Sequence, residues 1–126
     1  PLGNNHYRLY VHITDVAAYV KYNSELFKEA MRRGNSCYLS HFVFPMYPGI
    51  LSNNLCSLNE DGVKLTKTIE MEIDESGEIL TKRTYNSYIK SDKQMNYDQV
   101  NEFFEKGIIY TDYMPFYSSL IELKLA

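Results

Sequence analysis

Two segments of the chain, Tyr7–Ile13 and Leu65–Ile73, alternate between apolar and polar residues, which is the pattern of a β-strand with one buried face. A third segment, Glu78–Ile89, is predicted to return as the partner strand of Leu65–Ile73. Between the second and third segments lies Asp-Glu-Ser-Gly at positions 74–77, a composition typical of a tight turn. The pattern therefore predicts a β-hairpin preceded in the sequence by a further strand.

The apolar side chains of the first two strands are expected to share one face of each strand. They are Leu9, Val11 and Ile13 in the first strand, and Leu65, Ile69, Met71 and Ile73 in the second. The outer faces of the hairpin carry Glu70 and Glu72 on one strand and Lys82 and Arg83 on the other. Cross-strand charge pairs of this kind stabilise a sheet by a few tenths of a kcal/mol to about 1 kcal/mol each.

The sequence between the first strand and the hairpin contains one clear helix signal. Ser24 is a typical N-cap, Glu25 adds an acid to the first turn, and Gly34 follows the basic pair Arg32-Arg33. These residues predict a helix over 25–32. Asp15–Tyr19 is expected to form a turn and Cys37–Phe44 an extended segment.

The last third of the chain has two helical patterns. Val100, Phe103 and Phe104 predict an amphipathic helix from Tyr97 to Gly107, and a second apolar periodicity runs over Tyr113–Leu125. The second pattern reaches Ala126 without a capping residue. We interpret this as a boundary inside a longer protein.

The segment Phe44–Leu58 differs from both kinds of pattern. Pro45 and Pro48 lock φ and lack an N–H, so a rigid, non-helical path is predicted. Ser52, Asn53, Asn54 and Ser57 follow as short uncharged hydrogen-bonding side chains. Such a segment suits the lining of a surface better than the interior of a core.

Composition narrows the class of protein. The 126 residues are enough for one domain with its own core, and 44% hydrophobic and 23% charged residues are ordinary for a globular chain. The 12 tyrosines, with no tryptophan, favour stacking surfaces, although AT-rich coding would raise tyrosine as well. A net charge of −3 argues against an autonomous nucleic-acid-binding module.

The chain shows no complete active site of a familiar type. Neither Ser52 nor Ser57 lies in a G-x-S-x-G elbow that would pair it with one of the three histidines, and no phosphate-binding glycine motif occurs. The carboxylate pairs, at 60–61, 70/72 and 74–75, belong to turns or to outward faces, so we expect no metal site.

Cysteine content and hydropathy indicate the cellular compartment in which the protein is expected to work. Cys37 and Cys56 are too few for a zinc site; two reduced thiols are favoured over a single disulfide. The sequence has no N-glycosylation sequon, signal sequence or long apolar run. We therefore expect a cytoplasmic protein that does not act at a membrane.

Seven segments together resemble the catalytic (RNB) domain of the ribonuclease II/ribonuclease R family of 3′-to-5′ exoribonucleases, closer to the ribonuclease R side. They occur in the family's order over nearly the whole chain, and the L-S-N-x-L-C-S-L block is the most specific of them. The segments are V-H-I-T-D-V (Val11–Val16), R-R-G-N-S-C-Y (Arg32–Tyr38), P-M-Y-P (Pro45–Pro48), L-S-N-N-L-C-S-L-N (Leu51–Asn59), M-E-I-D (Met71–Asp74), I-K-S (Ile89–Ser91) and M-N-Y-D-Q-V-N (Met95–Asn101).

The resemblance implies a parent enzyme that degrades single-stranded RNA processively from its 3′ end, using Mg²⁺ and releasing nucleoside 5′-monophosphates. Tyr38 matches the family tyrosine that packs on a nucleotide near the cleavage site. Tyr97 matches a second active-site tyrosine linked to sensing the ribose end, and is the catalytic candidate. Ser52, Asn53 and Asn54 would lie along the RNA channel and bind its backbone.

Departures from the family limit what the chain can do alone. The aspartate cluster D-x-x-D-x-D-D that holds magnesium in the family is absent, so the resemblance implies no metal bound here and an inactive fragment. Val63-Lys64 replaces a usual Asp-Arg, and Tyr47 replaces a usual Leu. A non-catalytic homologue that binds RNA or protein is the alternative, and an autonomous interaction domain is disfavoured by the uncapped last helix.

The implied fold is α+β: a curved, mainly antiparallel sheet with packed helices, forming part of the RNB catalytic domain. Pro1-Leu2-Gly3 looks like the remnant of a protease site used in expression, so the partial domain is expected to span residues 4–126. A partial domain exposes apolar surface and strand edges, which predicts self-association.

Overall fold

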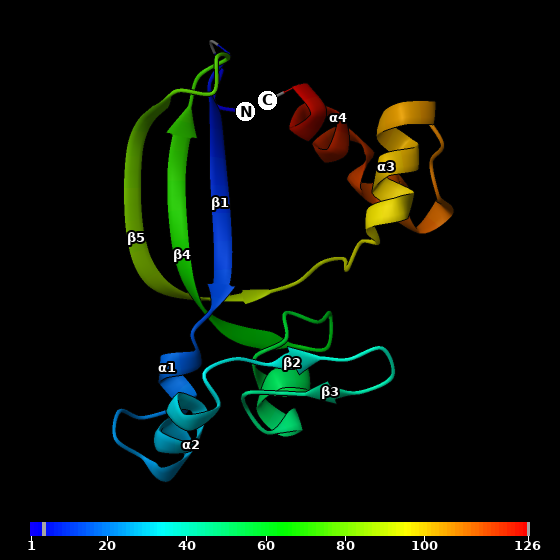
Figure 1. The fold of residues 1–126 in the computed structure, drawn as a ribbon. Helices are drawn as coiled ribbons and strands as arrows, with labels where there is room; N and C mark the ends of the chain where they lie inside the picture. Colours follow the sequence, from blue (N-terminus) through cyan, green and yellow to red (C-terminus); the bar gives the residue numbers. More distant parts are fainter. Residues whose placement is uncertain (4, 126) are drawn as a thin grey trace. The chain divides into compact units, whose positions relative to one another are not determined.

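A computed structural model describes residues 1–3 and 5–125, with side chains up to residue 122. The chain divides into two compact units, and each is described by itself. The first unit comprises Pro1–Val11, Ile69–Arg83 and Lys93–Ala126, and the second comprises His12–Thr68 and Thr84–Asp92. Helices and strands both contribute, so the α+β prediction is confirmed (Figure 1).

The largest sheet has the strand order β1-β4-β5, with β4 in the centre. Its strands are β1 (Tyr7–Thr14), β4 (Val63–Ile73) and β5 (Ile79–Lys90). The arrows of β1 and β4 point in opposite directions in Figure 1, so this pair is antiparallel. The turn between β4 and β5 forms as predicted, because the Asp74 carboxylate accepts hydrogen bonds from the backbone N–H groups of Ser76 and Glu78.

The prediction about the outer face of the hairpin is wrong. The polar residues of β4 are the buried ones: Lys64 and Glu70 are each 6% exposed, and Thr66 and Thr68 are fully buried. The apolar residues alternate with them and are more exposed, with Leu65 at 42%. The two faces of the strand are therefore inverted relative to the expectation from hydrophobicity.

Hydrogen bonds between strands explain this inversion. In the second unit, the Ser87 hydroxyl contacts both threonine hydroxyls, and His12 Nδ1 lies 2.7 Å from Thr68 Oγ1. In the first unit, Arg83 donates to Glu70 at 2.8 Å, as the predicted charge pairing requires, and Arg8 Nε lies 3.5 Å from the same carboxylate. Buried polar groups that satisfy one another in this way remain stable inside a protein.

The region after β1 is more helical than the sequence predicts. Residues expected to form a turn contain the short helix α1 (Val16–Tyr19). The predicted helix is confirmed as α2 (Glu25–Arg33): the Ser24 side chain accepts from the Phe27 N–H, and Gly34 ends the helix at φ 76°. The predicted extended segment forms the strands β2 (Cys37–Tyr38) and β3 (Val43–Phe44).

The proline-rich segment is also not entirely non-helical. Its residues Ile50–Leu55 form a turn of π-helix, η1. The Pro48 carbonyl accepts hydrogen bonds from the N–H groups of Leu51 and Ser52, and the Cys56 N–H closes the turn on the Leu51 carbonyl. Proline is compatible with this arrangement because it precedes the first turn, where no donor is required of it.

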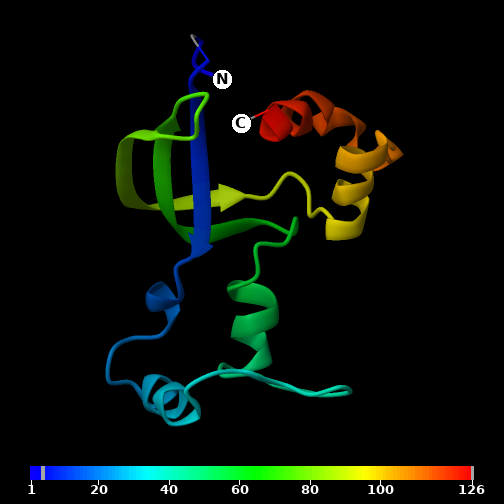
Figure 2. The same cartoon turned by 45° about the horizontal axis from the view of Figure 1, so that its top comes forward.

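The last part of the chain forms α3 (Tyr97–Lys106), the 3₁₀ helix η2 (Thr111–Phe116) and α4 (Tyr117–Leu125). The first agrees with the prediction, and the second predicted helix begins as a 3₁₀ turn. Phe103, Tyr113 and Leu120 form a buried cluster that joins the three helices. In Figures 1 and 2, η2 and α4 accordingly lie beside α3.

Two further predictions concern cysteines and membranes. Cys37 and Cys56 are free thiols, as expected. Within the part of the chain that is described, no helix has the length and apolar character needed to cross a membrane.

Candidate nucleic-acid interface

Tyr38 lies on a small hairpin of the second unit with its side chain 77% exposed. The hairpin pairs β2 with β3 antiparallel, with Cys37 opposite Phe44 and Tyr38 opposite Val43. The Leu39 N–H donates to the Phe42 carbonyl at 2.8 Å and closes the loop. Because side chains alternate across a strand, the Tyr38 ring shares one face of the hairpin with Val43.

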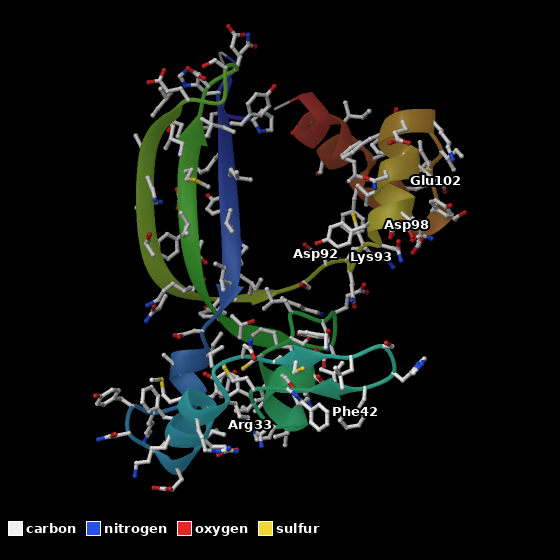
Figure 3. All side chains as sticks on the ribbon, in the orientation of Figure 1. Arg33, Phe42, Asp92, Lys93, Asp98 and Glu102 are labelled. Atoms are coloured by element: carbon white, nitrogen blue, oxygen red, sulfur yellow. The ribbon has the colours of Figure 1, made fainter. Side chains whose placement is uncertain are left out.

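The opposite face of this hairpin is aromatic as well. Phe42 and Phe44 make an edge-to-face contact with ring centroids 4.6 Å apart, and both are more than half exposed. A hollow of about 350 Å³ lies between Phe44 and the end of α2, lined also by Arg32, Arg33, Asn35 and Cys37. Figure 3 labels Arg33 at the end of α2 and Phe42 on the hairpin. Aromatic rings and guanidinium planes are the groups on which unpaired bases stack.

Two contacts tie the residues that follow β3 to the end of α2 and to the segment after it. Arg33 donates to the Pro45 carbonyl at 2.8 Å, and the Met46 N–H donates to the Ser36 hydroxyl at 2.9 Å. Glu29 holds Arg33 in turn, and also accepts two hydrogen bonds from Arg32. These two guanidinium groups lower the pKa of Glu29 from its ordinary value of 4.5 to about 2. The exposed tyrosine is thus carried by an anchored hairpin.

Ser52, Asn53 and Asn54 lie on η1 in the same unit, the last two exposed and Ser52 half-buried. The Ser52 hydroxyl is 3.2 Å from Asn53 Oδ1, and the Asn59 side chain donates to the Asn53 carbonyl at 3.4 Å. The side chain of Leu51, which belongs to the same turn, is buried and anchors η1. The three residues therefore form a short neutral polar surface, as the sequence predicts.

The sequence did not reveal the importance of Lys64, the residue that braces η1. Its Nζ atom donates to the Asn54 carbonyl at 3.0 Å and lies 2.9 Å from Asp61 Oδ1, and its side chain is only 8% exposed. The Lys64 ammonium lowers the pKa of Asp61 through this hydrogen bond. The predicted strand began at Leu65, whereas β4 begins at Val63, so the sequence assigned Lys64 to no strand and to no face.

Tyr97 belongs to the other unit, so the structure does not bring it together with Tyr38 within one compact body. It is the first residue of α3, and its side chain is 88% exposed. The Asn96 side chain caps this helix by accepting from the Asp98 N–H at 2.8 Å. Both predicted tyrosines are thus accessible on anchored elements.

The described residues offer no cluster of three or more His, Cys, Asp or Glu side chains that could hold a metal ion. Magnesium therefore does not fit the residues described here, and we assign no chemical step to a metal bound by them. The arrangement presents exposed aromatic rings and neutral hydrogen-bonding groups on elements that hydrogen bonds hold in place.

Comparison with known proteins adds a family assignment. A family model described as the RNB domain matches residues 1–113. A ribonuclease R of Thermotoga maritima is 49% identical over 115 residues, which cover 91% of this chain and 16% of that protein. The curated relatives that rank first are matched over only 12% to 16% of their own length.

Solved structures agree with this assignment. Mycoplasma genitalium RNase R, in complex with ribose-methylated single-stranded RNA, matches with a TM-score of 0.85 and 38% identity, over 94% of this chain and 19% of that one. The yeast protein Ssd1, described as a pseudonuclease, shares the fold with a TM-score of 0.77 at 18% identity, over 91% of this chain and 14% of that one.

Proposed function

The chain belongs to the RNB family, and we propose that it forms part of a 3′-to-5′ exoribonuclease that degrades RNA processively to nucleoside 5′-monophosphates. The observation that carries the proposal is the 77% exposed ring of Tyr38 on an anchored hairpin, at the position that matches the family's nucleotide-stacking tyrosine. Ribonuclease R relatives at 49% and 45% identity and a relative solved with single-stranded RNA support it.

In the proposed role, Tyr38 stacks on a base close to the 3′ end of the RNA. Stacking on an aromatic side chain contributes about 1–3 kcal/mol per base and tolerates every base, as a non-specific nuclease requires. Ser52, Asn53 and Asn54 bind the sugar–phosphate backbone through neutral hydrogen bonds. A surface of this kind needs no excess of basic residues, which is consistent with the net charge of −3.

Tyr97 is proposed to act at the terminal ribose. Its phenol hydroxyl is both a donor and an acceptor and can therefore recognise a 2′-OH, the group that distinguishes RNA from DNA. The 88% exposure of the side chain leaves it accessible to a nucleotide. The parent enzyme is proposed to be cytoplasmic and to use Mg²⁺ held by residues other than those described here.

A non-catalytic homologue is the second candidate, since the same fold occurs in a protein described as a pseudonuclease. Retention of both exposed tyrosines favours the enzyme, because a decayed site has no need of them.

The test is an assay of the full-length parent protein with single-stranded RNA labelled at its 5′ end. An exoribonuclease of this type produces a ladder that shortens from the 3′ end when Mg²⁺ is added and stops when it is chelated. The 126-residue chain assayed in parallel is expected to give no shortening, since it lacks the family's aspartate cluster. A parent protein that binds the RNA but leaves it intact with Mg²⁺ would establish the non-catalytic alternative.

A further inference from the structure

Tyr113 is hydrogen-bonded to Asn96, the residue that precedes Tyr97 in the chain. The family resemblance assigns no role to Tyr113. Its ring is 2% exposed and packs in the cluster with Phe103 and Leu120. The Lys93 ammonium lies 5.9 Å from the centre of the ring and 3.0 Å from a carboxylate oxygen of Asp112. Lys93 lies in the strand-to-helix connection just before α3, as Figure 3 shows. The position of the Tyr113 ring is thus fixed from several elements.

The hydroxyl of Tyr113 reaches the N-terminus of α3. It accepts a hydrogen bond from the Asn96 backbone N–H at 2.7 Å and donates one to Gln99 Oε1, also at 2.7 Å. Asn96 is the N-cap of the helix, with extended backbone angles, and Gln99 is the third helical residue.

This arrangement is a capping box with a phenol inserted into it. In a simple capping box the side chain of the third helical residue accepts directly from the N–H of the N-cap residue. Here the Tyr113 hydroxyl stands between these two groups and satisfies both. The helix start is therefore held by a side chain of the buried core and not only by its own residues.

We propose that Tyr113 is a positioning residue for Tyr97, a role that rests on the proposed function of Tyr97 at the terminal ribose. Asn96 immediately precedes Tyr97 in the chain, so the hydrogen bond that fixes the Asn96 amide also fixes where the helix begins and where the Tyr97 side chain projects. In Tyr113→Phe the ring remains in the core, while the Asn96 backbone N–H and the Gln99 side-chain oxygen Oε1 lose their common partner.

The chain offers a matched control in Tyr110→Phe. Tyr110 also packs against the cluster, and its ring centre lies 6.2 Å from that of Tyr113. Its hydroxyl donates to Glu102, in the second half of α3 and away from the N-terminus. The two variants each remove one hydroxyl from the same cluster, but only Tyr113→Phe acts on the helix start.

The first measurement is hydrogen exchange, read by mass spectrometry over residues 94–100 of the full-length parent protein. We expect Tyr113→Phe to raise exchange in this segment about three- to tenfold over wild type, since a buried hydrogen bond is lost, and Tyr110→Phe to leave it unchanged. Equal exchange in the two variants would overturn the proposal.

The second measurement is the ratio of kcat/KM for an RNA ending in a ribose to that for the same RNA ending in a 2′-deoxyribose. We expect Tyr113→Phe to change this ratio about threefold or more from the wild-type value, in the same direction as Tyr97→Ala changes it. Tyr110→Phe is expected to leave the ratio at the wild-type value. General destabilisation would lower both rates together, so an unchanged ratio in Tyr113→Phe would also overturn the proposal. If Tyr97→Ala itself leaves the ratio unchanged, the proposed role of Tyr97 fails. In that case the hydrogen exchange of residues 94–100 alone decides whether Tyr113 holds the start of α3.

Discussion

Lys64 shows how a buried charge can organise a polar surface. Its side chain is 8% exposed, and its ammonium group makes two short contacts, to the Asn54 carbonyl in η1 and to the Asp61 carboxylate. A buried charge without partners would be strongly unfavourable, so the contacts are needed to keep it there. The polar turn that bears Ser52, Asn53 and Asn54 therefore depends on a strand residue outside it.

Removing this brace is expected to destabilise the protein. Lys64→Met keeps the approximate length of the side chain but removes the charged donor of the Asn54 carbonyl, and loss of this hydrogen bond is expected to lower the free energy of unfolding by about 1–3 kcal/mol. Denaturant unfolding of the chain measures it. Lys67→Met is the matched control: Lys67 lies on the same strand and is exposed, so it should change stability by no more than about 0.5 kcal/mol. A loss as small in Lys64→Met as in the control would contradict the bracing role.

At the level of elements, the ion pairs of α2 connect helix stability to the hairpin of Tyr38. Glu29 accepts from both Arg32 and Arg33, and Arg33 also holds the Pro45 carbonyl. Proton binding to Glu29 would weaken its hold on the two guanidinium groups at once. The helix and the hairpin should therefore respond together to low pH.

The sign of this response follows from the lowered pKa of Glu29, which is about 2 in the folded protein against an ordinary 4.5. The contribution of Glu29 is fully present above pH 4.5 and is lost as the pH falls through about 2. We expect the stability difference between wild type and Glu29→Gln to stay constant above that window and to shrink within it. Denaturant unfolding over this pH range measures it, and a difference that does not vary with pH would contradict the ion-pair geometry.

Local signals in the sequence predicted the elements well and their faces poorly. The cap at Ser24, the stop at Gly34 and the turn at Asp74 depend on neighbouring residues only, and all three form as expected. The buried face of β4 depends on partners in other strands, such as Ser87 for the two threonines. Alternation identifies a strand, but it cannot say which face is buried when the polar face satisfies its own hydrogen bonds.

The candidate site depends on two kinds of signal in the sequence. Tyr38 and Tyr97 are proposed from their match to the family's motifs, and the polar turn from its prolines and short uncharged side chains. Lys64 and Tyr113 were missed, since each acts through a hydrogen bond to a backbone group that lies 10 or 17 residues away in the sequence. Neither hydrophobic periodicity nor a local motif predicts a hydrogen bond between a side chain and a distant backbone group.

At the scale of the whole molecule, the chain is a member of the RNB family that spans 12% to 16% of the curated relatives ranked first. Its two units each present one of the predicted tyrosines on an anchored element. The described residues present exposed aromatic and neutral hydrogen-bonding side chains, and they include no cluster that could hold a metal ion. The central proposal is accordingly that this region contacts the RNA substrate of the proposed parent exoribonuclease.

The most direct test of that claim compares Tyr38→Ala with Tyr22→Ala in the full-length parent protein, on single-stranded RNA. Tyr22 is a matched control, because it lies in the same unit and is 82% exposed, but outside the proposed RNA surface. Loss of one base stack is expected to lower kcat/KM by about 5- to 150-fold in Tyr38→Ala, while Tyr22→Ala stays close to wild type. If the two variants degrade RNA equally well, Tyr38 does not contact the substrate and the account is contradicted.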